Sequence, residues 1–288
     1  MENVLEITNL TKHFKDFSLQ GVNFELPAGY IMGFIGPNGA GKSTTIKLIM
    51  NLLYKDDGQI KVFGLDNIAH ETAIKNRIGF VYDENHFHEE LSIRQMARIV
   101  ASFYSSWEQP AFEKYLKKFG LNPKQKIKEL SKGMKLKFSL AVALSHRADL
   151  LIMDEPTAGL DPVVRSELLE ILASLLEDER KAVFFSTHIT SDLDKIADFV
   201  TFINNGRIEL SAAKDEILDR YAVVKGSTEL LNPDTRRLFT GLRMNKFGFE
   251  GLVRDRQEIR RLWQDRVIIE KPSLEDIMLY TVRGEHHA

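Results

Sequence analysis

Hydrophobic positions along the chain follow two different spacings. Apolar runs of strand length lie at residues 30–35, 150–153 and 182–186, and a segment with helical spacing follows each of the first two. Residues 4–8 and 22–26 instead alternate apolar and polar positions, as half-buried strands do. Apolar strands that alternate with helices are typical of a parallel sheet covered on both faces. The pattern therefore predicts an α/β fold with a mostly parallel sheet and an antiparallel β edge near the start.

A long stretch of helical spacing interrupts this alternation between residues 91 and 145. Its first helix is expected to bury an apolar face made of Leu91, Met96, Ile99 and Phe103. Helix breakers divide the rest into several helices, at Pro110, Gly120 and Pro123. We therefore expect a helical subdomain over about residues 88–146, inserted in a large domain of residues 1–210.

The hydrophobic pattern loosens from about residue 211. Short strands are predicted at residues 221–224, 247–253 and 267–270, followed by a last helix over 274–280. Ser273 precedes that helix and an acidic residue follows three positions later, as in a partial capping box. Residues 211–288 are thus expected to form a small C-terminal α+β appendage, and no chemistry is visible in them.

The segment between the strand at 30–35 and the next helix fits the pattern G-x-x-x-x-G-K-[ST]. It consists of Gly36, Pro37, Asn38, Gly39, Ala40, Gly41, Lys42, Ser43 and Thr44. Its glycines let several backbone N–H groups point at one anion, and the following helix N-terminus favours negative charge. Lys42 can neutralise the outer phosphates, and the Ser43 hydroxyl can hold Mg²⁺. The segment predicts a binding site for a nucleoside triphosphate with Mg²⁺.

Polar residues follow the two later apolar strands directly. Asp154 and Glu155 come after the strand at 150–153, and His188 comes after the strand at 182–186. Because the carboxyl ends of parallel strands meet at one edge of the sheet, these side chains are expected in the same crevice as the phosphate loop. Asp154 can order the Mg²⁺ shell, and Glu155 can accept a proton from an attacking water. Such general-base help is worth roughly 10²–10⁴ in rate.

Composition and charge narrow the function classes. The formal net charge of −2 over 288 residues argues against a nucleic-acid partner. The absence of cysteine excludes a disulfide framework and thiolate metal sites, and it fits a reducing compartment. The first residues do not have the pattern of a signal peptide, and no apolar run is long enough to span a membrane. We expect a soluble protein or a soluble subunit of a larger assembly.

Five motifs occur in a fixed order along the chain. They lie at residues 36–44, 130–135, 150–155, 158–161 and 186–188. This series resembles the Walker A, signature, Walker B, D-loop and switch motifs of ATP-binding cassette (ABC) ATPases, and it spans the whole nucleotide-binding domain at about residues 2–210. The resemblance implies a P-loop NTPase fold. Residues 158–161 and 272–276 look like the subgroup that serves drug, antimicrobial-peptide or ABC-2-type exporters.

The family implies a role for each matching residue. Two cassettes face each other head to tail, so Ser131 and Gly133 of one subunit would contact the γ-phosphate bound by the other. His188 would hydrogen-bond the γ-phosphate and align the water. Asp161 would link the two sites, and Phe14 stands where the family has an aromatic residue that stacks on adenine.

Two positions depart from the family pattern. The family has a glutamine after the strand that corresponds to residues 77–82, and Asp83 takes that position here. We carry the metal role over to Asp83, although a carboxylate adds repulsion to the phosphates. Lys132 stands where the signature usually has glycine, and its side chain would add charge near a phosphate or remain solvated.

The resemblance implies an ATPase subunit that powers export through a separate transmembrane permease by ATP-driven closure of a dimer. The second nucleotide-binding domain would be an identical or a different chain. The subunit would be cytoplasmic, held at the inner face of the membrane by the permease. Two alternatives stay open: an ABC ATPase of translation or DNA repair, and a nucleotide switch. The single cassette without basic excess argues against the first; Glu155 and His188 argue against the second, which Asp83 keeps open.

Overall fold

The protein is described here by a computed structural model that covers residues 2–82 and 86–284. Its central sheet has six strands in the order β10-β9-β3-β8-β7-β6. The five strands from β9 to β6 run parallel, and β10 pairs antiparallel with β9. Their bounds are β3 Ile31–Ile35, β6 Ile78–Val81, β7 Leu150–Met153, β8 Ala182–Thr187, β9 Phe199–Asn204 and β10 Arg207–Ala213. The predicted α/β fold with a mostly parallel sheet is confirmed.

A second, antiparallel sheet packs against one face of the central sheet. Its order is β2-β1-β4-β5, with β1 Asn3–His13, β2 Ser18–Pro27, β4 Asp57–Val62 and β5 Leu65–Asp66. Phe24 of this sheet stacks on Phe184 of β8, with ring centroids 5.6 Å apart. The neighbouring Phe185 belongs to a different core, on the opposite face. The central strands are apolar throughout because both of their faces are buried.

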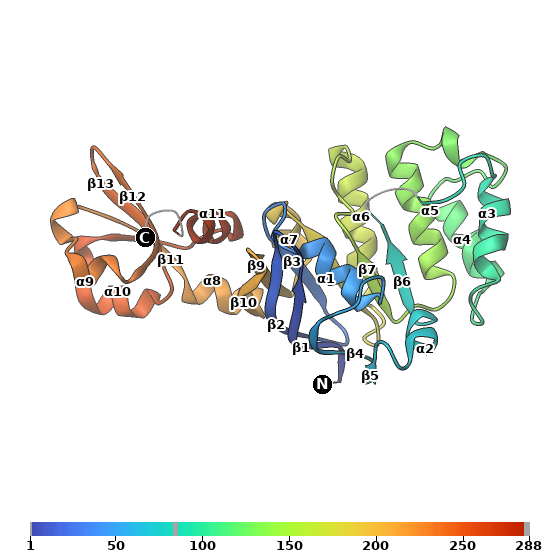
Figure 1. Cartoon of the computed structure of the whole chain (residues 1–288). Helices are drawn as coiled ribbons and strands as arrows, with labels where there is room; N and C mark the ends of the chain where they lie inside the picture. Colours follow the sequence, from blue (N-terminus) through green and yellow to red (C-terminus); the bar gives the residue numbers. More distant parts are fainter. Residues whose placement is uncertain (1, 83–85, 285–288) are drawn as a thin grey trace.

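Helices cover the central sheet, and a helical subdomain lies beyond β6 at one end of it (Figure 1). The helical subdomain contains three main helices, α3 Ile93–Ala101, α4 Gln109–Lys118 and α5 Lys132–Leu144. The helices nearer the sheet are α1 Lys42–Ile49, α2 Glu71–Lys75, α6 Pro162–Leu175 and α7 Thr190–Ile196. A short 3₁₀ helix at Ile127–Glu129 precedes α5.

The expected apolar face of the first subdomain helix is wrong in part. Ile99 is 43% exposed and Phe103 is 75% exposed, whereas α3 buries Ile93, Met96 and Ala97. A capping box at Ser92 starts the helix one residue before Ile93 and so sets the phase of its buried stripe. Phe103 lies beyond the end of the helix.

The C-terminal unit has its own antiparallel sheet in the order β12-β13-β11-β14. The strands are β11 Ala222–Gly226, β12 Phe239–Asn245, β13 Gly248–Val253 and β14 Ile268–Glu270. The helices are α8 Lys214–Arg220, α9 Pro233–Arg236, α10 Arg256–Trp263 and α11 Leu274–Gly284, with 3₁₀ turns at Thr228–Leu230 and Gln264–Arg266. The strand β10 runs across the division expected at residue 210.

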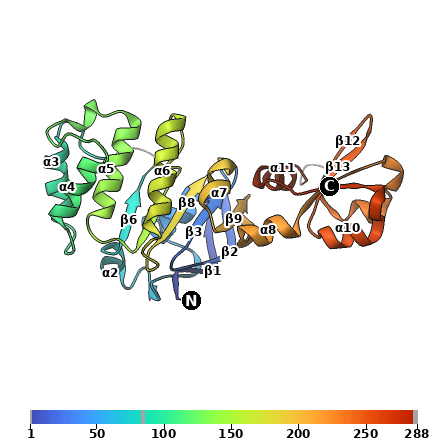
Figure 2. The same cartoon turned by 180° about the vertical axis from the view of Figure 1, so that it is seen from behind.

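Two helices sandwich this small sheet. Trp263 of α10 packs with Phe249 and Val253 on one face. On the other face α11 packs against β12 and β13, and also against α7 of the large domain. Ser273 caps α11 as expected, because its hydroxyl accepts from the Asp276 N–H at 3.1 Å and donates to the Asp276 carboxylate at 2.7 Å. Figures 1 and 2 show this unit and the helical subdomain at opposite ends of an elongated molecule.

Candidate functional site

The phosphate loop lies between β3 and α1, as expected. Lys42 is the first residue of α1 and is only 5% exposed. Its ammonium group donates to the carbonyl oxygens of Gly36 at 2.7 Å and Pro37 at 3.2 Å. Gly41 has a φ of +115°, and a Cβ there would lie 2.6 Å from the Leu19 side chain. The backbone at Gly41 therefore requires glycine, and the loop holds Lys42 at the mouth of the helix N-terminus.

Glu155 contacts two other residues that were predicted from the sequence to belong to the site. One of its carboxylate oxygens lies 3.1 Å from Lys42 Nζ, and the other lies 2.8 Å from His188 Nδ1. The ends of β7 and β8 are thus brought to the phosphate loop by the parallel register of the sheet. A cation, a carboxylate and an imidazole meet where the outer phosphate of a bound nucleotide would lie.

Ser186 is a site residue that the sequence analysis did not assign. Its hydroxyl donates to Asp154 Oδ1 at 2.6 Å and accepts from the Glu155 N–H at 3.0 Å. Asp154 is buried, so this bond fixes the orientation of a carboxylate that has little contact with water. The parallel pairing of Met153 with Phe185 places Ser186 level with Asp154. Two adjacent strands that both end in polar residues were the available sequence signal.

A cavity of about 800 Å³ opens around these groups. Six residues of the phosphate loop and three of the strand-end and D-loop segments line it together with other side chains: Asp16, Phe17, Asn38, Gly39, Gly41, Lys42, Ser43, Thr44, Lys132, Glu155, Ala158 and His188. Phe14 does not line it and is 43% exposed, whereas Phe17 does. The two rings lie 6.3 Å apart, centroid to centroid. Phe17 is the aromatic residue in reach that the sequence analysis missed.

The donors fit a magnesium ion that is held mainly by phosphates and water. Ser43 lines the cavity, and the buried Asp154 directly follows β7. Within residues 2–82 and 86–284, no cluster of three or more histidine or carboxylate side chains could form a cage for a metal. One hydroxyl and one carboxylate match the usual protein share of a Mg²⁺–nucleotide shell. Asp83, the third expected metal residue, lies outside the described residues.

The signature residues contact their own chain in other ways. Ser131 caps α5 by accepting from the Met134 N–H at 3.3 Å, and a Cβ on Gly133 would lie 2.9 Å from Val164. Neither residue lines the nucleotide cavity of its own chain, but Lys132 between them does. Its ammonium lies over Gly159, at 3.1 Å from where a Cβ of that glycine would be.

Asp161 ends the D-loop and caps α6. Its Oδ1 accepts from the N–H groups of Val163 and Val164, each at 3.0 Å. The cap leaves the other carboxylate oxygen for further contacts.

In the part of the chain that the structure describes, no helix is both long and apolar enough to cross a bilayer.

Comparison with known proteins gives consistent matches. The family model described as ABC transporter matches residues 19–158. The bacitracin transport ATP-binding protein BcrA of Bacillus licheniformis is 34% identical over 211 residues, which is 72% of this chain and 69% of that protein. The lantibiotic transport ATP-binding protein SrtF of Streptococcus pyogenes is 35% identical, over 74% of this chain and 92% of its own length. A solved ATP-binding subunit of an ABC transporter superposes with a TM-score of 0.69 at 28% identity, over 75% of this chain and 92% of that one.

Proposed function

The chain belongs to the ABC transporter family as an ATP-hydrolysing subunit, and we propose that it works with a separate membrane protein and powers export of a peptide antibiotic or a similar drug. The relatives named for bacitracin and lantibiotic transport support this class of cargo. The linearmycin resistance ATP-binding protein LnrL of Bacillus subtilis, 34% identical over 75% of this chain, supports it as well.

The contacts of Glu155 carry the assignment of the hydrolytic site. In the proposal, the loop from Gly36 to Thr44 holds the phosphates of ATP, with Lys42 beside the outer ones. Glu155 takes a proton from the attacking water, and His188, which contacts the same carboxylate, aligns that water against the γ-phosphate. Bound nucleotide replaces Glu155 as the partner of the Lys42 ammonium, and the carboxylate then becomes free to act as a base.

Ser43 and Asp154 would hold Mg²⁺, with Asp83 as a third candidate. When bound, the ion neutralises charge on the transferred phosphoryl group. Ser186 positions Asp154 for this role through the 2.6 Å hydrogen bond. On the adenine side, Phe14 remains the candidate from the family pattern, and the cavity wall adds Phe17.

A second cassette completes each site in the proposal. Ser131 and Gly133 lie outside their own cavity, as residues that serve the nucleotide of a partner would. Asp161, at the start of α6, would connect the two sites across the interface. Binding of ATP closes such a dimer, and hydrolysis opens it. The motion would pass to a permease that holds residues 1–210 at the cytoplasmic face of the membrane, with residues 211–288 as an accessory unit.

Glu155→Gln tests the assignment of the base. The amide cannot accept the proton, so ATP hydrolysis should fall roughly 10²–10⁴-fold while ATP still binds. Nucleotide affinity should not decrease, because the Lys42–Glu155 ion pair no longer has to be broken. Phosphate release and equilibrium binding of labelled ATP measure the two quantities.

Glu170→Gln, on the exposed side of α6, is the matched control and should leave both quantities unchanged. Full turnover in Glu155→Gln would remove Glu155 from the role of base. For the cargo, cells that carry the chain with its permease should resist bacitracin or a lantibiotic, and cells with the Glu155→Gln chain should not. Equal sensitivity of both strains to every such peptide would contradict the proposed cargo class.

A further inference from the structure

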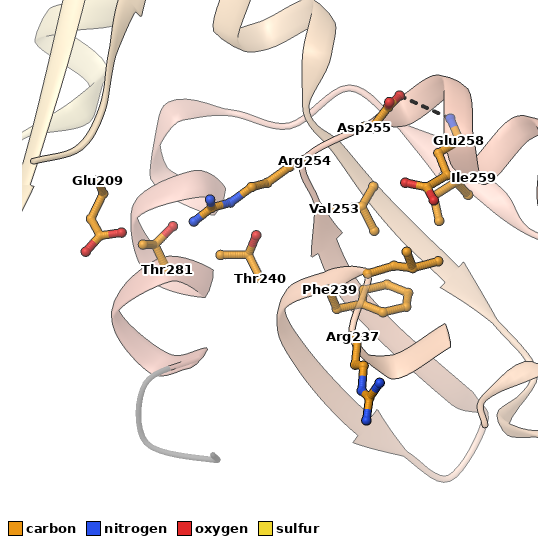
Figure 3. A pocket seen from close by; sticks show the side chains of 11 residues that line it. Glu209, Arg237, Phe239, Thr240, Val253, Arg254, Asp255, Glu258, Ile259 and Thr281 are labelled. Carbon is orange, nitrogen blue, oxygen red and sulfur yellow. Dashed lines mark hydrogen bonds between the residues drawn. The ribbon is translucent and has the colours of Figure 1, made fainter. Parts of the chain in front are cut away.

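A second cavity lies where the C-terminal unit meets the large domain. It has a volume of about 630 Å³, within the range of small-molecule sites. Glu209 of β10 contributes one wall and Thr281 of α11 another, while β12, β13 and the start of α10 supply the rest (Figure 3). The nucleotide cavity described above shares none of these residues. The junction cavity is therefore a separate site with walls from both parts of the chain.

The polar side of the junction cavity suits an anionic group. The guanidinium of Arg254 points toward Thr281 and Thr240 in Figure 3, and no described carboxylate lies within ion-pair distance of it. Thr281 is only 6% exposed, and its hydroxyl donates to the Ile277 carbonyl at 2.7 Å, so its oxygen can still accept. A guanidinium fork binds a carboxylate or a phosphate through two parallel hydrogen bonds. Arg254 is the group that would fix the headgroup of a ligand.

The opposite side of the junction cavity is apolar. Phe239, Val253 and Ile259 line it, and the last two are buried members of the small hydrophobic core of the C-terminal unit. Arg237 stands at this side and points away from Arg254 in Figure 3. A ligand that reaches from Arg254 to Phe239 must therefore combine a charged end with an apolar body.

Three carboxylates also line the cavity, and two of them have roles of their own. Asp255 caps α10, because its Oδ1 accepts from the N–H groups of Gln257 at 2.8 Å and Glu258 at 3.1 Å. Glu209 has an interaction of its own within the chain. Glu258 lies in the first turn of α10, where the helix dipole favours a negative charge. Asp255 and Glu258 lie at the end of the cavity near α10 and disfavour a second anionic group there, whereas Glu209 of β10 lies on the side of Thr281 (Figure 3).

The helix α11, which forms one wall of the junction cavity, is connected to the nucleotide site by packed side chains. Thr281 follows Ile277 by one helical turn, and Ile277 packs in the same core as Leu193 of α7. The helix α7 begins two residues after His188. Leu193 also packs on β3, the strand that leads into the phosphate loop, so closely that a Cβ on Gly33 would lie 2.2 Å from it. Packed side chains therefore connect α11 to the segments that carry His188 and the phosphate loop, and such a chain of contacts can transmit a shift of α11.

We propose that the junction cavity binds an organic anion with an apolar tail, such as an amphiphilic carboxylate, and that this binding changes nucleotide affinity through α11 and α7. Arg254, Thr240 and Thr281 hold the headgroup, and Phe239, Val253 and Ile259 contact the tail. The bound anion adds contacts between α11 and the C-terminal sheet, and α11 transmits them to α7.

A series of three probes with one tail and three headgroups tests the site. Decanoate, decylammonium and decanol are titrated into the full-length, nucleotide-free protein by calorimetry. Decanoate should bind, and the other two should bind on the order of tenfold more weakly or worse, because a hydrogen bond to a charged group is lost. Similar binding of all three probes would show nonspecific hydrophobic binding without recognition of the headgroup, and it would overturn the proposal.

Arg254→Gln and Arg261→Gln form the matched pair of variants. Both arginines are exposed, but Arg261 does not line the cavity. Decanoate affinity should fall on the order of tenfold in Arg254→Gln and stay unchanged in Arg261→Gln. Thr281→Val, which keeps the shape of the side chain, should weaken decanoate less than Arg254→Gln does. Equal affinity in Arg254→Gln and the wild type would overturn the assignment.

The coupling is tested without hydrolysis. Saturating decanoate should change the affinity for ADP by about fivefold or more, and saturating ADP must then change the affinity for decanoate by the same factor. The factor should disappear in Arg254→Gln and persist in Glu155→Gln, which separates this proposal from the role of Glu155 in hydrolysis. Decanoate binding that leaves ADP affinity unchanged would refute the link through α11 and α7.

Discussion

Glu155 makes contacts with several other residues of the candidate nucleotide site, through both its backbone and its side chain. Its φ of +47° lies in the left-handed region, which costs a non-glycine residue about 1–3 kcal/mol unless its surroundings fix it. The Ser186 hydroxyl binds its N–H, and Lys42 and His188 hold its carboxylate. Strain at this position therefore serves to hold a carboxylate at the mouth of the phosphate loop.

The sequence predicted that Glu155 belongs to the site, but it did not predict the left-handed backbone of this residue. The pattern of an apolar strand followed by Asp154 and Glu155 is local, so it can be recognised along the chain. The left-handed backbone depends on Ser186, which is 31 residues away and becomes a neighbour only when β7 and β8 pair. Phe17 was missed for a similar reason, since the fold of the preceding loop decides which aromatic ring faces the cavity.

His146 gives the stability of the protein a dependence on pH. It is buried beside Tyr104, with the two rings stacked at 3.8 Å, and burial lowers the pKa of its imidazole below the ordinary 6.5. Below pH 6.5 the unfolded chain therefore binds a proton that the folded chain does not. The free energy of unfolding should fall as the pH drops from 6.5 toward the pKa of the folded state, by up to about 1.4 kcal/mol per pH unit.

His146→Phe keeps a ring against Tyr104 and removes the titration. Between pH 6.5 and the lower pKa, its unfolding free energy should depend less on pH than that of the wild type, whatever its absolute stability. Urea unfolding at several pH values measures this slope. His70→Phe, at an exposed position, is the control and should keep the wild-type slope. A slope in His146→Phe equal to that of the wild type would show that other groups cause the loss of stability in acid.

At the scale of elements, capping residues and tertiary contacts fix what periodicity leaves open. The apolar positions before α3 fit more than one helical phase, and the capping box at Ser92 selects the phase that buries Ile93, Met96 and Ala97. By contrast, the cap at Ser273 was readable from the sequence, because both of its partners are local. Strand β10 was missed because its half-buried positions follow no strict alternation.

The contact between β3 and α7 is close enough to be tested by a single methyl group. A Cβ on Gly33 would lie 2.2 Å from Cδ2 of Leu193, which is fully buried. Gly33→Ala should therefore destabilise the protein by about 1–3 kcal/mol through overpacking. Leu193→Ala alone should cost about 2–5 kcal/mol through the cavity it leaves.

The double variant decides between packing and any other effect of the alanine. In the Leu193→Ala background the new methyl group has room, so Gly33→Ala should cost close to nothing there. Urea unfolding of the four proteins gives the coupling energy between the two positions. If Gly33→Ala costs the same in both backgrounds, then α7 does not pack on β3 in the way described.

At the scale of the molecule, the cavity at the phosphate loop is lined by only one of the three central signature residues of its own chain. The phosphate loop, Glu155 and His188 meet in one chain, whereas Ser131 and Gly133 of the same chain do not line that cavity. The helical subdomain and the C-terminal unit lie at opposite ends of the elongated chain (Figures 1 and 2). A second copy placed head to tail is the arrangement that would bring a signature segment to each phosphate loop.

Mixing two inactive variants distinguishes shared sites from self-contained ones. Lys42→Ala disables the phosphate loop, and Ser131→Arg disables the signature, so each variant alone should have little ATPase activity. In a mixed head-to-tail dimer both defects fall in one site, and the other site is intact. An equal mixture should therefore recover about a quarter of the wild-type rate, since half of the dimers are mixed and each has one working site of two.

The control is Lys42→Ala mixed with Glu155→Gln, and this mixture should recover nothing. Each chain supplies both Lys42 and Glu155 to the same site, so each of the two sites in a mixed dimer carries one of the two changes. No recovery in the first mixture would mean that each chain uses its own signature or that both sites must work together, and recovery in both mixtures would contradict the head-to-tail arrangement.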